Sequence, residues 1–200
     1  MLVKQIINPL FNSNTYVLSQ AKSNRVWLID IGEFEKVLQF LKKDDIIRGV
    51  FITHSHFDHI YGINALIDAF PACVVYASGF AEKGLFSEKL NMSFYHEDPV
   101  VFKGSNIHVL REGDRVELFK NLFLEVMETP GHNEGSLSFK VGPYLFTGDS
   151  YIPNVKVVTK LKSGNRLESE KSLKKIFDHI STDTIVCPGH GAITKASSWK

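Results

Sequence analysis

The sequence predicts an α/β protein in which short strands outnumber helices. Apolar runs of strand length, rich in Val, Ile, Leu and aromatic residues, alternate with turn residues, and segments with helical spacing lie between them. Strand-like runs cluster at 2–30 and at 106–149, which indicates two sheets, or one large mixed sheet, with helices packed outside. At 200 residues and 44% hydrophobic composition, we expect one domain spanning 1–200.

Each predicted strand is a short β-rich run bounded by turn residues such as Gly, Asn, Asp, Pro or Ser. In chain order the runs are 2–8, 14–19, 25–32, 47–54, 73–78, 106–110, 121–130, 136–142, 144–149 and 184–190.

Helices are predicted over 33–43, over 59–70, over 80–90 and near the end of the chain. The third contains Gly84, which disfavours a helix interior. Two segments show i, i+3, i+4, i+7 spacing, which predicts one apolar stripe facing a core. The stripes consist of Phe34, Val37, Leu38 and Leu41 and of Leu173, Ile176, Phe177 and Ile180.

The segment 150–168, "SYIPNVKVVTKLKSGNRLE", mixes apolar and basic residues with Pro153 and Gly164. Its composition favours a loop, either one that borders a site or an ordinary connection between a strand and a helix.

Composition excludes several classes of partner. Lys and Arg (23) nearly balance Asp and Glu (22), so no strong basic field is expected to bind nucleic acid or an anionic membrane. The first residues, "MLVKQIINPLF", resemble neither a signal peptide nor an anchor, and no run approaches the length of a membrane span. Cys73 and Cys187 lie in unrelated contexts, which favours a reducing cytoplasm over a disulfide framework.

The densest group of chemically active residues is "HSHFDH", 54–59, directly after an apolar run. Side chains two apart on an extended chain point the same way, so His54 and His56 are predicted to share one ion. Asp58 and His59 follow where the chain turns toward a helix, which makes a second ligand set plausible. Imidazole and carboxylate groups are ligands that zinc and similar divalent cations favour. The alternative is solvated histidines at a strand end with Asp58 as a helix cap.

Three later segments each place one ligand-type residue after an apolar run, in a Gly-containing turn: "ETPGHNEGS", "LFTGDS" and "VCPGHG". They add His132, Asp149 and His190. The combined set is too large for one tetrahedral ion and suits two ions that share a carboxylate. The predicted division is His54, His56 and His132 on one ion, Asp58, His59 and His190 on the other, and Asp149 between both.

The remaining histidines have no ligand-type neighbour at useful spacing. They are His96, His108 and His179, and we interpret them as structural or surface residues.

These motifs resemble those of the metallo-β-lactamase-fold hydrolases. "HSHFDH" matches their HxHxDH motif, the later ligand positions follow in order, and "LIDIG", with Asp30, is similar to their second-strand motif. The resemblance implies a four-layer αβ/βα sandwich, two mixed sheets face to face with outer helices and the metals at one edge.

Within that family the sequence is most similar to the short glyoxalase II-like (hydroxyacylglutathione hydrolase-like) enzymes, in which an aspartate at the position of Asp149 bridges the ions. Two departures leave open whether glutathione is recognised. The chain has "SYIPNVKVVTK" where a Gly- and Arg-containing stretch usually follows "TGD", and it ends shortly after Gly191, whereas long members continue into a helical domain.

The expected function is hydrolysis of a thioester, ester or lactone by a hydroxide that two divalent ions activate, with zinc expected and iron or manganese as alternatives. Asp58 is predicted to bind metal and to orient the nucleophile or relay its proton, and Tyr151 and Lys156 are candidate substrate contacts. Tyr151 as a packed aromatic and Lys156 as a solvated surface residue are the competing interpretations. The expected partner is a small molecule. Three alternative functions remain: a phosphodiesterase or nuclease, a mononuclear-iron persulfide dioxygenase, and a non-catalytic binder of a regulatory ligand.

Overall fold

The computed structural model describes residues 1–198 and confirms an α/β fold with two mixed sheets, each of six strands. The chain forms two compact units, Met1–Val109 and Leu110–Lys200. The expectation of a single domain over 1–200 stays a prediction.

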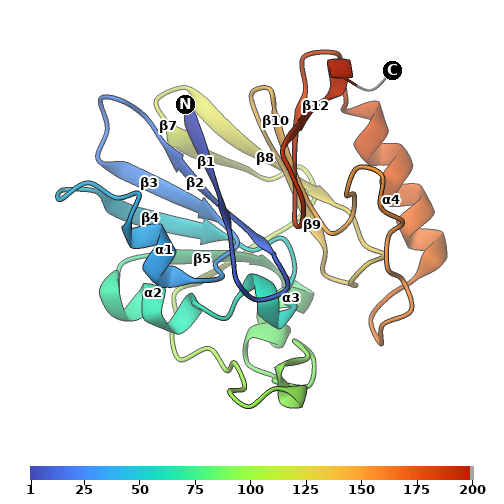
Figure 1. The fold of residues 1–200 in the computed structure, drawn as a ribbon, viewed down its shortest axis with the longest axis horizontal. Coiled ribbons are helices and arrows are strands. Elements are labelled where there is room, and N and C mark those ends of the chain that lie inside the picture. The colour runs from blue at the N-terminus through green and yellow to red at the C-terminus, as the bar shows by residue number, and fades with distance from the viewer. Residues whose placement is uncertain (199–200) are drawn as a thin grey trace. The chain divides into compact units, whose positions relative to one another are not determined.

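The first unit is built on the sheet with strand order β1-β2-β3-β4-β5-β6 (Figure 1). The first three strands pair antiparallel, whereas β3, β4 and β5 pair parallel. Parallel neighbours require crossover connections, and the helices of this unit lie in or beside those connections. The strands are β1 (Leu2–Ile7), β2 (Asn14–Ser19), β3 (Arg25–Ile29), β4 (Ile46–Phe51), β5 (Val74–Ser78) and β6 (Ile107–Leu110).

Helices α1 (Phe34–Leu38), α2 (Ile63–Ala69) and α3 (Gly79–Leu85) supply buried side chains to the same core as strands β3, β4 and β5. This core explains two differences from the predicted helices. Helix α1 is shorter than 33–43 because it buries only Phe34 and Val37, while Leu38 is 40% exposed. The predicted helix 59–70 begins only at Ile63, since Phe57–His59 forms a separate 3-10 turn.

The second unit contains the sheet with strand order β12-β11-β10-β9-β8-β7. All its pairings are antiparallel except β10 with β11. Two strands had not been predicted: β7, which forms a hairpin with β8 through Asn121 at φ 60°, and the two-residue β12. The strands are β7 (Arg115–Phe119), β8 (Leu122–Glu128), β9 (Leu137–Val141), β10 (Tyr144–Gly148), β11 (Ile185–Pro188) and β12 (Thr194–Lys195).

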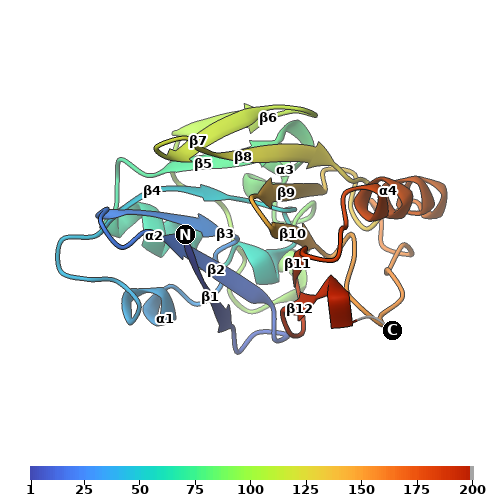
Figure 2. The ribbon, with the colours of Figure 1, turned by 90° about the horizontal axis from the view of Figure 1, so that it is seen from above.

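Helix α4 (Arg166–Asp178) lies beside the strands of the second sheet (Figure 2). It begins earlier than the predicted stripe because the Asn165 side chain accepts hydrogen bonds from the backbone N–H groups of Leu167 and Glu168 and so caps the helix. Its buried side packs Ile176 against Met127 and Leu145.

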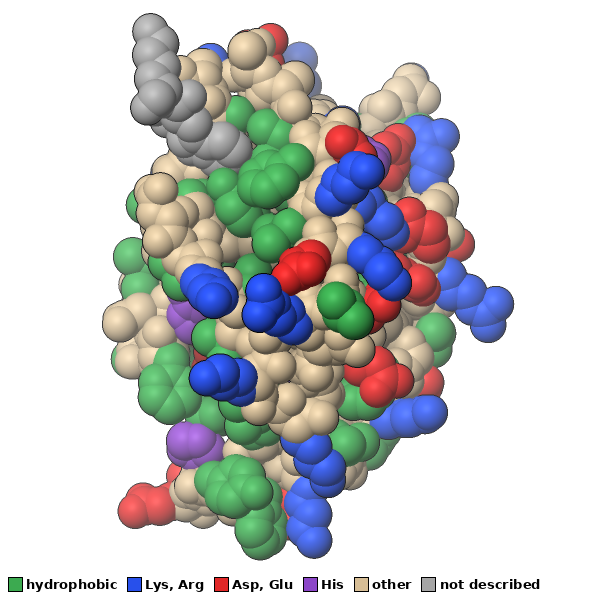
Figure 3. Space-filling view, turned by 90° about the vertical axis from the view of Figure 1, so that its right-hand side faces the viewer, with side chains coloured by type: hydrophobic (Ala, Val, Ile, Leu, Met, Phe, Trp, Pro, Cys, Tyr) green, Lys and Arg blue, Asp and Glu red, His purple; other side chains and the backbone are tan. Residues whose placement is uncertain are grey.

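The outer side of α4 carries ion pairs between neighbouring turns, Arg166 with Glu170 and Lys171 with Glu168. Figure 3 shows basic and acidic side chains interspersed on the face that it presents. This mixture agrees with the balanced charge of the sequence. No helix among residues 1–198 is long and apolar enough to cross a membrane.

Cys73 and Cys187 are buried free thiols. Burial raises the pKa of Cys73 to about 12 and raises the pKa of Cys187 as well, so both thiols stay protonated at neutral pH.

The strand ends position the candidate ligands. Strand β4 ends at Phe51, three residues before His54, and β8, β10 and β11 end directly before the turns that hold the later ligand-type residues. Each candidate ligand therefore follows the carboxyl end of a strand, where rigid backbone meets a short turn.

Replacing Gly84 by Ala should lower the free energy of unfolding by about 1–3 kcal/mol, although alanine normally stabilises a helix interior. A Cβ atom at Gly84 would overlap the buried Ser55 side chain, which lies between His54 and His56 in the sequence. Urea denaturation of both proteins measures the change.

Gly79 in the same helix is the matched control, because a Cβ atom there meets only Val109 at 3.9 Å. Gly79→Ala should be neutral or stabilising by up to about 1 kcal/mol. Equal effects of the two substitutions would contradict the packing of α3 against Ser55.

Candidate metal centre

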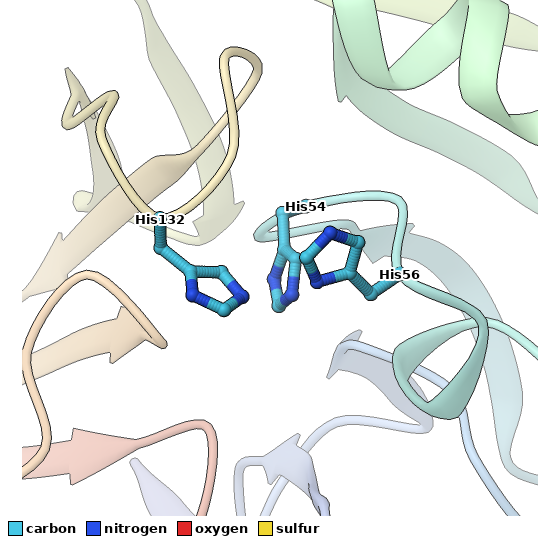
Figure 4. A group of neighbouring side chains, drawn as sticks. All are labelled: His54, His56 and His132. Atoms are coloured by element: carbon cyan, nitrogen blue, oxygen red, sulfur yellow. The ribbon is translucent and has the colours of Figure 1, made fainter. Parts of the chain in front are cut away.

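The first unit gathers four of the predicted ligands. His54 and His56 project from the loop after β4 (Figure 4), and the 3-10 turn carries Asp58 and His59; all four are buried. The ring centroid of His54 lies 4.6 Å from that of His56 and 4.3 Å from that of His59. The Nε2 atom of His59 lies 3.5 Å from the Asp58 carboxylate.

The change in backbone conformation after His56 produces this arrangement. His56 is extended, with φ −63° and ψ 142°, and the tight turn Phe57–His59 starts at the next residue. The turn re-aims Asp58 and His59, as the sequence predicted. Ser13 holds the turn from outside, because its hydroxyl donates a 2.7 Å hydrogen bond to the backbone carbonyl of Asp58.

Asp30 organises the buried side of this cluster. One carboxylate oxygen accepts a 2.7 Å bond from the backbone N–H of Thr53, and the other accepts from the Thr53 hydroxyl at 2.7 Å and from Nδ1 of His59 at 2.8 Å. Burial raises the pKa of Asp30, and these partners oppose that shift. Asp30 also adopts φ 55°, a left-handed conformation uncommon outside glycine.

Thr53 determines which nitrogen of His54 carries the proton. Its only hydroxyl hydrogen goes to Asp30, so its oxygen accepts from Nδ1 of His54 at 3.1 Å. Nδ1 of His54 is therefore protonated and Nε2 carries the lone pair.

The second unit gathers the other three predicted ligands. The same carboxylate oxygen of Asp149 lies 3.5 Å from Nε2 of His132 and 3.4 Å from Nε2 of His190. His132, in the turn after β8 (Figure 4), donates from Nδ1 to the backbone carbonyl of Val158 at 2.9 Å. The predicted loop 150–168 ends at 165, where α4 follows, and its residue Val158 borders a candidate ligand and fixes its ring.

The hydrogen-bonding pattern suits a divalent cation. In His54, His59 and His132, Nδ1 donates to an oxygen of the protein, which leaves the lone pair on Nε2. Ligating histidines typically donate their other ring N–H to such an acceptor. Neutral imidazoles and carboxylates then form a donor set that zinc, iron or manganese accepts.

Sequence reasoning missed the supporting residues. Thr53 and Ser13 carried no motif, and Val158 contributes only a backbone carbonyl. Asp30 was noted only as part of "LIDIG", without a role. Its signal is a carboxylate at the end of an apolar strand, a position at which burial needs partners.

Tyr151 and Lys156 lie in different surroundings. The Tyr151 ring packs against Phe177 with centroids 5.1 Å apart and against the cluster of Met127, Leu145 and Ile176, called the α4 core below. Burial raises the pKa of Tyr151. Lys156 is exposed and lines a cavity of about 460 Å³ together with Lys160 and Arg166.

The other three histidines lie outside the ligand set. His108 and His179 are exposed. His108 contacts Tyr76, and His179 directly follows the last residue of α4. His96 stacks on Phe57 with a centroid distance of 3.8 Å.

The chain is similar to several known proteins. A hydroxyacylglutathione hydrolase of Blochmanniella pennsylvanica (strain BPEN) is 32% identical over 144 residues, 71% of this chain and 49% of the relative. The enzyme of the same name from Citrobacter koseri is 28% identical over 183 residues, 91% of this chain and 63% of the relative. The chain thus spans about half to under two thirds of the length of these curated relatives.

The crystal structure of the BLEG-1 B3 metallo-beta-lactamase superposes with a TM-score of 0.87 at 28% identity, covering 97% of this chain and 94% of that one. The model of the metallo-beta-lactamase superfamily matches residues 8–190. Since this match includes every candidate ligand, from His54 to His190, and nearly the whole chain, the protein belongs to the metallo-beta-lactamase superfamily.

Proposed function

We propose that the protein is a hydrolase that uses two divalent metal ions, zinc by preference, on a small-molecule thioester, ester or lactone. The observation that carries the proposal is the shared orientation of His54, His59 and His132, which donate from Nδ1 and keep the Nε2 lone pair for a cation. The curated relatives named hydroxyacylglutathione hydrolase support acyl transfer to water as the reaction. We place the enzyme in the cytoplasm, where its two buried thiols would remain reduced.

We assign His54, His56 and His132 to one ion, Asp58, His59 and His190 to the other, and Asp149 to both. Distances within each unit support this proposal. Nε2 of His59 lies 3.5 Å from the Asp58 carboxylate, and one carboxylate oxygen of Asp149 lies 3.5 Å from Nε2 of His132 and 3.4 Å from Nε2 of His190.

Two ions held in this way would supply an activated water and would polarise the carbonyl of the substrate. Side chains and backbone groups of the protein orient the attacking water and the histidine rings. The Asp58 carboxylate accepts a proton or a hydrogen bond from the attacking water and so orients it. The buried carboxylate of Asp30 fixes the ring of His59 through Nδ1, and Val158 fixes the ring of His132.

Lys156 and Tyr151 remain the proposed substrate contacts. The exposed ammonium of Lys156, near Lys160 and Arg166, suits an acidic group of a substrate. The Tyr151 ring belongs to the α4 core, so its contribution is restricted to the hydroxyl.

Hydrolysis of a β-lactam is a second candidate, favoured by one observation. The BLEG-1 structure, described as a B3 metallo-beta-lactamase, matches 97% of this chain. A substrate panel of thioesters, esters, lactones and β-lactams separates the two candidates.

The unmodified protein, purified without added metal, should contain about two equivalents of divalent metal. Asp149→Ala and His132→Ala should each lower both the metal content and kcat/KM. We expect a loss of at least about 10³-fold in kcat/KM, because each change removes a ligand. Elemental analysis and the substrate panel provide the two measurements.

His108→Ala is the control, since His108 is exposed and contacts only Tyr76 among the described ring partners. It should keep full metal content and activity. Full metal content and activity in both ligand variants would contradict the assignment, and one iron with sulfur-dependent oxygen uptake would instead indicate the dioxygenase.

Asp30→Asn should weaken binding of the ion assigned to His59 by about 10–100-fold and leave the other ion less affected. The two carboxylate oxygens of Asp30 accept three hydrogen bonds, whereas an amide has only one oxygen that can accept. In Asp30→Asn, either Thr53 or Nδ1 of His59 therefore loses its acceptor. Competition with a chromophoric chelator measures the two affinities.

Asp45→Asn is the matched control, because the partly buried Asp45 carboxylate also accepts a backbone hydrogen bond, from the N–H of Lys42, and no candidate ligand takes part in that bond. It should bind both ions normally. Asp30→Asn could instead lose both ions and, by circular dichroism, its fold. That result would show that Asp30 has a structural role rather than a positioning one.

A further inference from the structure

A second cavity, of about 520 Å³, lies within the first unit. Phe57 forms part of its wall and is flanked in the sequence by His56 and Asp58. Its volume falls within the range of small-molecule sites. The residues that line it are Leu10, Phe57, Tyr61, Asn64, His96, Glu97, Asp98, Pro99 and Val100.

Hydrogen bonds hold both loops that border the cavity. In the loop before β2, the Asn8 side chain donates to Ser13 and Thr15 and accepts from the backbone N–H of Glu33. In the second loop, the buried Asn91 donates to the carbonyl of Val100 at 2.7 Å, and the N–H of Val100 donates to Ser93. The cavity is therefore preformed.

Aromatic rings make up one wall. His96 stacks on Phe57, and Phe11 packs edge-on against both, with centroid distances of 5.7 Å and 6.1 Å. Tyr61 adds a third lining ring, and its hydroxyl is buried. Burial, followed by the carboxylate of Glu33, raises the pKa of Tyr61 to about 12, so this hydroxyl is neutral at physiological pH.

The charged residues of the cavity share one sign. Glu97 and Asp98 line it and are exposed, and its lining contains neither Lys nor Arg among the residues that the structure describes. Aromatic faces bordered by carboxylates attract cations and disfavour anions.

We propose that this cavity binds a positively charged ammonium substituent of the substrate and thereby determines specificity. The inference rests on the proposed hydrolase function and adds the class of substrate: an acyl compound with an amine or quaternary ammonium group attached to an apolar segment. Phe57, Tyr61 and His96 contact that segment and the cation, and Glu97 and Asp98 neutralise its charge.

The first test measures binding to the metal-loaded protein with two probes that share one ring, benzyltrimethylammonium and phenylacetate. We expect the cation to bind at least about tenfold more tightly than the anion. The double variant Glu97→Gln with Asp98→Asn should reduce that ratio to about twofold. A ratio near one for the unmodified protein would overturn the proposal.

The matched control is Glu35→Gln with Asp44→Asn, which changes net charge equally at exposed positions outside the cavity lining. It should keep the tenfold ratio, and an equal fall in both double variants would also overturn the proposal, since it would indicate a general charge effect.

The second test compares kcat/KM for three thioesters of equal length that end in trimethylammonium, tert-butyl or carboxylate. We expect kcat/KM to fall in the order cationic, neutral, anionic thioester, with about tenfold between the first two. In the variant Glu97→Gln with Asp98→Asn this difference should shrink to about twofold. Hydrolysis without a charge preference contradicts this proposal alone. Selective binding of the cation without hydrolysis of any substrate contradicts the proposed function alone.

Discussion

The buried carboxylate of Asp30 is the constraint on which the first half of the candidate metal centre depends. It accepts three hydrogen bonds within 2.8 Å, from the backbone and side chain of Thr53 and from Nδ1 of His59. A buried carboxylate without such partners would cost several kcal/mol. Through the Thr53 hydroxyl the same network also sets the proton of His54. One carboxylate therefore orients two histidines that are five residues apart, and the φ of 55° at Asp30 is the local strain that accompanies this arrangement.

In the second unit, a backbone carbonyl rather than a carboxylate orients a candidate histidine ligand. His132 donates to the backbone carbonyl of Val158, and the Asp149 carboxylate lies within 3.5 Å of both His132 and His190. A carbonyl oxygen can only accept, so the tautomer of His132 is settled without a second carboxylate. The loop that supplies this carbonyl also carries Lys156, so a substrate group bound there would lie on the segment that positions a ligand.

The acidic aromatic cavity would give the proposed hydrolase its specificity. Part of its lining, Leu10 and residues 96–100, lies in loops, whereas Phe57 comes from the ligand segment 54–59. Loops tolerate sequence change better than the strands that carry the ligands.

The sequence by itself determined the α/β class, the main strands, the four helical segments and all seven candidate ligands, because each of these leaves a local signal in periodicity or in residue type. The limits of α1 and the 3-10 turn at Phe57–His59 depended on what the core could bury. Only the tertiary structure decided the partners of the ligands. Asp30 with His59 and His132 with Val158 are hydrogen bonds between residues 29 and 26 positions apart, and no local pattern encodes such pairings. The cavity is likewise a product of folding, since its wall joins Leu10 to Val100.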